Sequence, residues 1–201
     1  MERDTIIQAG LEAALKLAET RPWGELTLAE IARESGQSLD MFHGIADRAA
    51  LNGCLDGMLD KAMSEGSLDP GETPRTRLFD VIMLRFEAME QVRDGLLSFL
   101  RWRDGSLDGL AIRVRARLDT ASWALACAGL DADQGPPRQL ERAGLAWVYG
   151  RAEAAWRSET SSDLSRTMSV LDGELVKASR RMSWLNRMRR RPGAQYPDTG
   201  R

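Results

Sequence analysis

The stretch TLAEIARESGQS at residues 27–38 carries the clearest structural signal in the chain. Thr27 and Glu30 stand three residues apart ahead of an apolar run, which is the spacing of a capping box and predicts that a helix begins after Thr27. Gly36 can take the left-handed conformation that ends a helix, and Ser38 can cap a second, very short helix. Two short helices joined by a turn that contains glycine are typical of a helix-turn-helix.

The flanks of this stretch also predict helices. On the N-terminal side, a single apolar face runs from Ile7 to Ala18 and ends ahead of Pro22. On the C-terminal side, Gly44 closes the very short helix and Asp47 caps a longer one. The apolar stripe of that longer helix is Leu51, Leu55, Met58 and Ala62.

The rest of the chain also predicts helices, because apolar residues recur at spacings of three and four and no window alternates with a period of two. A linker rich in Gly, Asp and Pro spans residues 64–72, and a loop spans 131–137. We expect the last helix to run from about residue 162 to 190. The stripes of the later helices are Leu78, Ile82, Phe86 and Met89; Leu110, Val114, Leu118, Ala121 and Leu125; Leu140, Trp147 and Ala154; and Leu164, Met168, Leu171, Leu175, Ala178, Met182 and Leu185.

The predicted fold is therefore all-α, in three parts. A helix-turn-helix unit covers residues 1–46, a connector helix and bundle cover 47–191, and a tail covers 192–201. We expect the long apolar stripe of the last helix and the stripe of the helix before it to form a four-helix interface on the two-fold axis of a homodimer. Gly53 and Gly57 are spaced for close packing of the connector helix against a neighbour.

The composition excludes several classes of protein. Of the 201 residues 43% are hydrophobic and 29% charged, which excludes a disordered or a membrane-embedded chain. The N-terminus shows no signal-peptide pattern, so we expect a cytoplasmic protein. Cys54 and Cys127 form no Cys-x-x-Cys pair, so neither a disulfide framework nor a cysteine zinc site is expected.

The net charge of −2 conceals an asymmetry along the chain. Residues 1–61 hold six Lys or Arg against eleven Asp or Glu, whereas residues 174–201 hold eight against two. A surface that binds a polyanion should be basic. Any such surface is therefore easier to place at the C-terminus than in the helix-turn-helix.

The sequence also argues against an enzyme. It contains no glycine-rich phosphate loop, no Gly-x-Ser-x-Gly and no His-Glu-x-x-His motif. His43 is the only histidine, so a histidine metal pair is excluded, and the segment 131–135 lacks the third acidic ligand of a calcium loop. We expect no catalytic residue, no metal and no cofactor.

Residues 27–38, together with the segment DRAAL at 47–51, resemble the second helix, turn and start of the fourth helix of the TetR family of bacterial regulators. This resemblance implies a homodimer whose N-terminal part binds a double-stranded DNA operator. It also implies that a small apolar effector binds within the C-terminal bundle, which supplies the dimer interface.

The resemblance implies two sets of site residues. The expected DNA contacts are Thr27, Gln37, Ser38, Leu39, Met41, Phe42, His43 and Arg48. The expected pocket residues are Phe86, Phe99, Trp102, Trp123 and Trp147, although aromatic residues at helical spacing also fit a core.

The chain departs from the TetR pattern at the helix that enters the major groove. Between Ser38 and Arg48 it is one residue shorter, and the third helix contains neither Lys nor Arg. Asp40 on this helix would face the phosphates and weaken binding. The lysine that the family places before the leucine of the fourth helix is here Arg48, which keeps a phosphate contact.

A second resemblance gives an alternative function. Residues of the C-terminal half are similar to a lipid-binding family of ubiquinone biosynthesis that keeps the TetR fold without binding DNA. These residues are Trp123, Ala128, Gly129, Asp131, Arg142, Leu145, Ala146, Tyr149, Trp156, Asp163 and Thr167. In this interpretation the pocket holds an isoprenoid-like ligand, and the arginine-rich end of the last helix makes a weak contact with a membrane.

Overall fold

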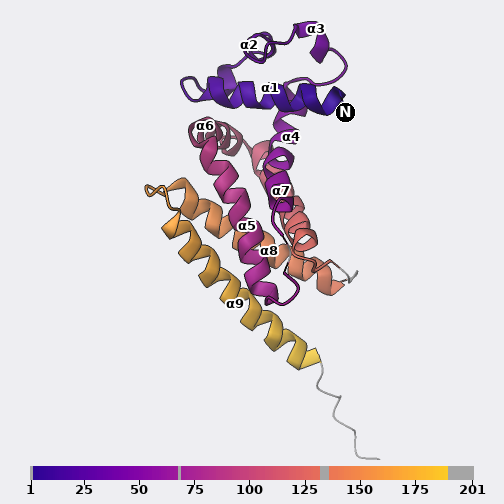
Figure 1. Ribbon diagram of the computed structural model, residues 1–201, viewed down its shortest axis with the longest axis vertical. Helices are drawn as coiled ribbons and strands as arrows, with labels where there is room; N and C mark the ends of the chain where they lie inside the picture. Colours follow the sequence, from indigo (N-terminus) through magenta and orange to yellow (C-terminus); the bar gives the residue numbers. More distant parts are fainter. Residues whose placement is uncertain (1, 68, 132–135, 190–201) are drawn as a thin grey trace, which may run out of the picture.

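In the computed structural model, the described residues (2–67, 69–131 and 136–189) form nine α-helices and two short 3-10 helices, with no strand among them. The all-α prediction is therefore confirmed. Helices α1 (Glu2–Ala18), α2 (Leu28–Glu34) and α3 (Leu39–Phe42) form one layer, drawn at the top of Figure 1. Below it lie α4 (Arg48–Asp60), α5 (Pro74–Gln91), α6 (Arg93–Asp104), α7 (Leu107–Cys127), α8 (Pro136–Arg157) and α9 (Ser165–Arg189).

The helix-turn-helix forms through the local signals that the sequence carries. The Thr27 hydroxyl accepts a hydrogen bond from the Glu30 backbone N–H at 3.3 Å, and the Glu30 carboxylate accepts one from the Thr27 N–H at 2.9 Å. This is the predicted capping box. Gly36 and Gly44 have φ angles of +70° and +74°, a conformation that favours glycine. The prediction for Ser38 is confirmed only in position, because its side chain makes no capping hydrogen bond.

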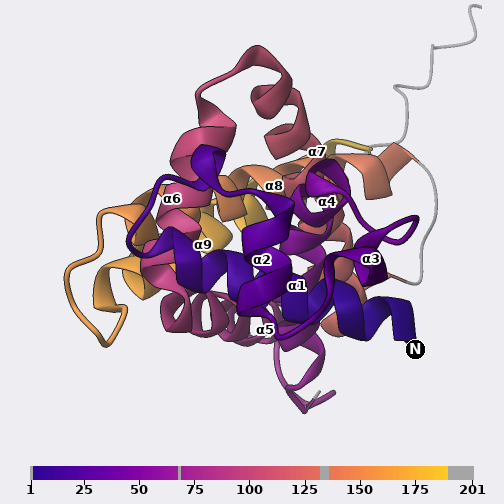
Figure 2. The ribbon, with the colours of Figure 1, turned by 90° about the horizontal axis from the view of Figure 1, so that it is seen from above.

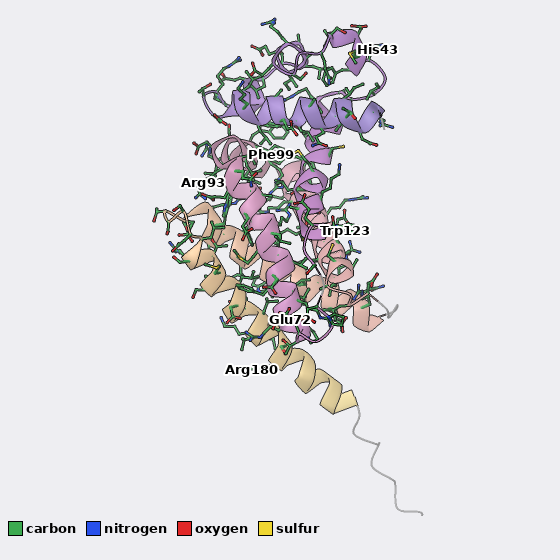
Figure 3. The ribbon with its side chains drawn as sticks, viewed as in Figure 1. His43, Glu72, Arg93, Phe99, Trp123 and Arg180 are labelled. Carbon is green, nitrogen blue, oxygen red and sulfur yellow. The ribbon has the colours of Figure 1, made fainter. Side chains whose placement is uncertain are left out.

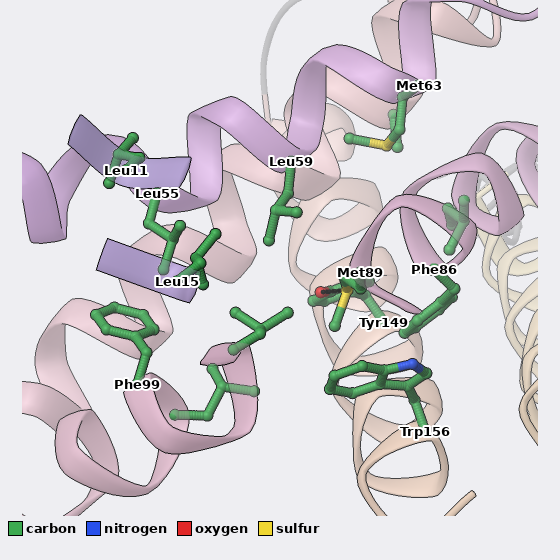
Figure 4. Close-up of a cluster of buried hydrophobic side chains, with 14 of the residues drawn as sticks. Leu11, Leu15, Leu55, Leu59, Met63, Phe86, Met89, Phe99, Tyr149 and Trp156 are labelled. Atoms are coloured by element: carbon green, nitrogen blue, oxygen red, sulfur yellow. Dashed lines mark hydrogen bonds between the residues drawn. The ribbon is translucent and has the colours of Figure 1, made fainter. Parts of the chain in front are cut away.

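The helix-turn-helix layer is anchored to the bundle through the short 3-10 helix Trp23–Glu25. Trp23 is fully buried; its backbone N–H donates to the Ser98 hydroxyl and its indole N–H to the Asn52 side chain, both at 3.0 Å. Its ring meets Phe99 edge to face at 4.9 Å between centroids. Figure 4 shows Leu11 and Leu15 of α1, Leu55 of α4 and Phe99 of α6 in this shared core. The two layers are thus joined by a continuous core.

The bundle corrects the predicted dimer interface. Leu171 and Leu175 of α9 are 0% and 4% exposed, because α9 packs its apolar stripe onto α8 and α5 of its own subunit. That stripe is therefore part of the core. On α8, by contrast, the predicted stripe faces outward, with Leu140 61% and Trp147 63% exposed and Ala154 exposed as well. Met182 and Leu185 lie outside the residues whose side chains the structure describes.

The predicted stripe of α7 is buried only in its second half. Ala121 and Leu125 are in the core, whereas Val114 is 57% exposed and Leu110 only half-buried. Most of the loop expected at residues 131–137 lies outside the described part of the chain. Figure 2, which looks down onto the helix-turn-helix layer, shows α2 and α3 lying over the end of the bundle.

Candidate functional site

The outer surface of α3 carries polar, acidic and apolar side chains but no lysine or arginine. Ser38, Asp40 and His43 are exposed, and Leu39 and Met41 are 49% and 38% exposed. Figure 3 shows His43 at the outer edge of the layer, away from the bundle. No Lys or Arg belongs to this surface.

Phe42 does not belong to this outer surface, although we expected it to contact DNA. It is 1% exposed, and a Cβ built on Gly10 of α1 would lie 2.9 Å from its ring. A four-residue helix needs an apolar anchor, so its one large aromatic residue packs beneath it onto α1. Phe42 therefore holds α3 in place and is not available to a base.

Arg48 is likewise engaged inside the protein. One of its Nη atoms donates to the Trp23 carbonyl at 2.8 Å, and its guanidinium lies 5.1 Å from the Trp23 ring centroid. Burial lowers the pKa of this guanidinium. Arg48 therefore fixes the start of α4 against the 3-10 helix, and the expected phosphate contact would require it to leave Trp23.

The cations near α2 are paired with its acidic residues. Lys16 lies 2.6 Å from Glu34, and Arg21 lies 2.7 Å from Glu30. The hydrogen bonds from Arg21 and Thr27 hold the pKa of the Glu30 carboxyl at about 2. Among the described residues of the helix-turn-helix layer, Arg3 and Arg33 remain exposed without an ion pair.

The other two expected DNA contacts lie at the ends of α2. The Thr27 side chain is exposed but bonded to Glu30 in the capping box. Gln37 is half-buried in the turn, and its Oε1 has no hydrogen-bond partner in the part of the chain that the structure describes. The structure thus leaves Ser38, Leu39, Met41 and His43 as the predicted contacts that are free on one surface.

A buried ion network lies in the bundle, next to the connector helix. Arg85 of α5 is 1% exposed; its Nε donates to Asp60 at 2.5 Å and one Nη to Asp56 at 2.9 Å. Its other Nη meets the Tyr149 hydroxyl. The Thr120 hydroxyl donates to Asp60 at 3.0 Å. Burial raises the pKa of Asp60, which Arg85 and Thr120 oppose.

The network continues through α6, α7 and α8. Glu153, 3% exposed, accepts hydrogen bonds from Arg117 at 3.0 Å and from Arg157 at 2.5 Å. Burial raises the pKa of Glu153, but these two guanidiniums outweigh it and lower the pKa. Arg103, which is 3% exposed, links the part of the network around Arg85 to the part around Glu153. One of its nitrogens lies 3.3 Å from Asp56 and another lies 3.8 Å from Glu153. Five helices are thereby tied to each other.

A groove of about 530 Å³ lies between α4, α6 and α7. Phe99, Trp102 and Ile112 supply its apolar walls, and Asp56, Asp60 and Arg103 bring the ion network to its surface. Among the described residues, no atom outside the helix's own backbone and the chain neighbours lies within 4 Å of a Cβ built on Gly53 or Gly57. The predicted close packing at these glycines is therefore wrong: they line the groove and keep it open.

The expected pocket residues do not gather in one place. Phe99 and Trp102 line the groove, with ring centroids 6.0 Å apart. Phe86 is buried elsewhere and stacks on Tyr149 at 5.5 Å. Trp123 and Trp147 are 44% and 63% exposed and do not line the groove. Figure 3 shows Trp123 well below Phe99 in the molecule.

Sequence reasoning missed Asp56, Asp60 and Arg85. One signal was present: Asp56 and Asp60 are four residues apart and each directly follows a leucine of the buried stripe of α4. Acidic residues bordering a buried stripe need a cationic partner. Which arginine supplies it depends on tertiary packing.

Several residues of the second, lipid-binding resemblance have structural roles. Tyr149 bonds to Arg85, and the Trp156 indole donates to Glu90 at 2.8 Å. Thr167 is fully buried, and its backbone N–H donates to Glu159 at 3.0 Å. The arginine-rich end of the last helix lies outside the residues whose side chains are described.

The described part of the chain holds neither a membrane-spanning helix nor a metal-binding cluster. No helix there is long and apolar enough to cross a membrane. Within the same ranges, no group of three His, Cys, Asp or Glu side chains is placed to hold a metal ion.

Comparison with known proteins identifies the fold. No model of a known protein family and no curated protein matches the sequence. A TetR transcriptional regulator from Nitrosomonas europaea superposes with a TM-score of 0.69 over 86% of this chain and 97% of that one, at 19% identity. A TetR transcriptional regulator from a Rhodococcus species gives a TM-score of 0.60 over 89% and 97%, at 15% identity. The chain therefore has the TetR fold, and neither structure supports the second resemblance.

Proposed function

We propose that this chain, which has the TetR fold, is a ligand-responsive transcriptional regulator that binds operator DNA as a homodimer. One observation carries the proposal: a helix-turn-helix stands on a connector helix, α4, that itself lines a groove in the bundle. An event in the groove can therefore move the surface that would meet DNA.

The DNA contacts of this proposal come from the exposed side of α3. Ser38, Leu39, Met41 and His43 would face the bases, and Arg33 at the end of α2 would face a phosphate. With no guanidinium or ammonium on α3, base recognition relies on apolar and neutral polar contacts. The electrostatic part of the affinity is accordingly small.

The homodimer of this proposal uses the outward face of α8. Leu140, Trp147 and Ala154 are exposed there and lie seven residues apart, on one side of the helix. Two tryptophans and two leucines on a two-fold axis would bury the large apolar side chains that one subunit leaves in water. Trp147→Glu should yield a folded monomer, as measured by light scattering and circular dichroism.

The core residue Leu171 provides the contrast to Trp147. Leu171→Asp places a charge where the side chain is 0% exposed, so the subunit itself should unfold. A dimer of unchanged mass for Trp147→Glu would contradict the α8 interface.

The effector of this proposal binds in the groove beside α4. Asp56 and Asp60 fix α4 to Arg85 of α5, so a ligand that presses on α4 would tilt it against this attachment. Two half-sites on B-DNA lie about 34–36 Å apart, and a small tilt changes the separation of the two α3 helices. Ligand binding would thus release the operator.

Selection from random-sequence duplexes tests the proposed function. We expect selection to yield a duplex with two half-sites. This duplex should bind two protomers and should be bound more tightly than random duplex. Ser38→Ala should weaken binding to the selected duplex, since Ser38 is exposed at the start of α3. Absence of any binding at low salt would contradict the proposal. Pelleting with cardiolipin-containing vesicles under the same conditions would then favour the lipid-binding alternative.

A further inference from the structure

We infer that the groove between α4, α6 and α7 takes an amphipathic organic cation, a molecule with an aromatic or aliphatic body and a protonated nitrogen. This inference deepens the effector site of the proposed function and rests on it. It replaces the wholly apolar effector that the sequence suggested.

The groove is kept open by small residues. Gly53 and Gly57 lie one helical turn apart on α4, and Ala116 faces the same space from α7. Protein interiors are close-packed, yet among the described residues a Cβ added at position 53 would have no atom within 4 Å outside its own helix backbone and chain neighbours. A space of about 530 Å³ that is lined by aromatic residues and a few polar groups has the character of a ligand site.

The ion pairs beside the groove are oriented, with the carboxylate nearer to the open space than the guanidinium. The Asp56 side chain is 23% exposed, while its partners Arg85 and Arg103 are 1% and 3% exposed. Asp60 is 13% exposed against 1% for Arg85. The groove therefore meets the negative end of each pair, and the positive ends lie behind it.

The Asp56 carboxylate, which is more exposed than its arginine partners, keeps hydrogen-bonding capacity for a ligand. Arg103 directs its three nitrogens toward Asp56, Asp104 and Glu153, and at 3% exposure its side chain presents little surface to a ligand. Asp56 accepts from Arg85 and Arg103, and a carboxylate can accept about four hydrogen bonds. A ligand N–H group can satisfy this remaining capacity, and a ligand carboxylate cannot.

The apolar walls suit the body of such a molecule. Trp102 and Ile112 are 44% and 49% exposed, and Phe99 lies behind Trp102. An aromatic face also attracts a cation directly. At the rim, Asp119 bonds to Arg142 at 3.0 Å and lies 3.8 Å from Arg115, which is 88% exposed, so among the described residues the rim adds no carboxylate without a cationic partner. The groove therefore offers one face to an apolar body and one carboxylate, Asp56, to a cation.

Isothermal titration calorimetry on the full-length protein tests this inference with three naphthalenes of matched size. They are 2-naphthylmethylamine, a cation at neutral pH, the neutral 2-naphthylmethanol and the anion 2-naphthoate. We expect the amine to bind about tenfold more tightly than the alcohol, because it adds a charge-assisted hydrogen bond, and the acid to bind most weakly. Equal affinities, or a preference for the acid, would overturn the inference.

Two variants locate the binding in the groove. Gly53→Leu should abolish amine binding while keeping the fold, because it fills the groove and improves helix propensity. Ala111→Leu adds the same side chain at an exposed position of α7 that does not line the groove, and should bind as the wild type does. Unchanged amine affinity in Gly53→Leu would overturn the inference.

A third variant identifies the charged partner. Asp56→Asn should bring the affinity for the amine down to that for the alcohol, and an undiminished preference for the amine would contradict the role of Asp56. If this variant fails to fold, the three-ligand comparison on the wild type and the Gly53→Leu variant still test the inference. The selected duplex is measured separately: DNA binding without amine preference overturns this inference alone, and absence of DNA binding overturns the proposed function.

Discussion

The helix-turn-helix layer and the bundle use their charged residues in opposite ways. In the layer, Thr27, Glu30 and Asp47 bond to groups three residues away, and α3 presents an aspartate to the outside. In the bundle, buried arginines bind carboxylates of other helices, as Arg85 binds Asp56 and Asp60. In the described part of the layer, Lys16 and Arg21 are paired with α2 and only Arg3 and Arg33 are exposed without an ion pair, so few cations are left for a DNA-binding surface. The connector helix α4 shows both arrangements, because it begins at the local cap Asp47 and its last turns carry Asp56 and Asp60 of the ion network.

The largest expected effect is at Arg85. Arg85→Met leaves Asp56 and Asp60 without their buried partner and should lower the free energy of unfolding by about 3–5 kcal/mol. Urea unfolding followed by circular dichroism measures it. Arg75→Met breaks an exposed ion pair, in which the Arg75 and Asp172 side chains are 44% and 51% exposed. It should lower the free energy of unfolding by at most about 1 kcal/mol. Equal losses in the two variants would remove the distinction between buried and surface pairs.

A second prediction compares glycines of the two regions. Gly36 has a φ of +70°, so Gly36→Ala should lower the free energy of unfolding by about 1 kcal/mol. Gly53 lies inside α4 with open space around it, so Gly53→Ala should raise it by about 0.5–1 kcal/mol. Thermal unfolding of both variants shows whether the same substitution changes sign. A loss at Gly53 would mean that its Cβ meets an atom.

The two regions also differ in how far the sequence predicts them. The capping box, the turn glycine Gly36 and the Asp47 cap each depend on residues within a few positions, so the backbone of the layer could be predicted. The ion network joins Asp56 to Arg85 over 29 residues and Arg117 to Glu153 over 36 residues. Such pairs depend on helix packing, which periodicity does not determine.

The same limit explains why the dimer stripe and the pocket were predicted only in part. Periodicity identified the buried stripe of α9, but on α8 it selected an exposed stripe and missed the buried side that carries Leu145, Tyr149 and Ala152. It also does not say whether a side faces its own subunit or a partner. Leu171 faces the core and Trp147 faces outward. Of the five aromatic residues expected in a pocket, Phe99 and Trp102 line the groove. The groove itself depends on Gly53 and Gly57, where the informative feature is a missing side chain.

A third prediction concerns pH and the layer alone. Hydrogen bonds from Arg21 and Thr27 hold the Glu30 pKa at about 2, below its ordinary value of 4.5. The ionised carboxylate therefore stabilises α2 above pH 4.5, and this contribution is lost as the pH falls toward 2. A carboxyl NMR titration should place the Glu30 midpoint near 2, and Glu30→Gln should remove that part of the acid sensitivity. A midpoint at the ordinary value would mean that the Arg21 contact does not persist in solution.

The smallest expected effect concerns base recognition by the layer. Because Leu39 and Met41 are the exposed apolar side chains of α3, we expect the selected duplex to carry thymines whose methyl groups they contact. Replacing such a thymine by deoxyuracil removes one methyl and should weaken binding about threefold to fourfold. The same replacement outside the half-sites is the control. A selected site rich in guanine contacts, with no response to deoxyuracil, would contradict this assignment.

The salt dependence of binding to the selected duplex tests the central claim most directly. The few unpaired cations of the layer predict a saturable complex whose log–log slope of affinity against salt is shallow, between about −2 and −5 for a dimer. Asp40→Lys should steepen that slope by about one unit per protomer. No preference for the selected duplex over a scrambled one at any salt concentration, together with no response to Asp40→Lys, would contradict the claim that this helix-turn-helix binds DNA.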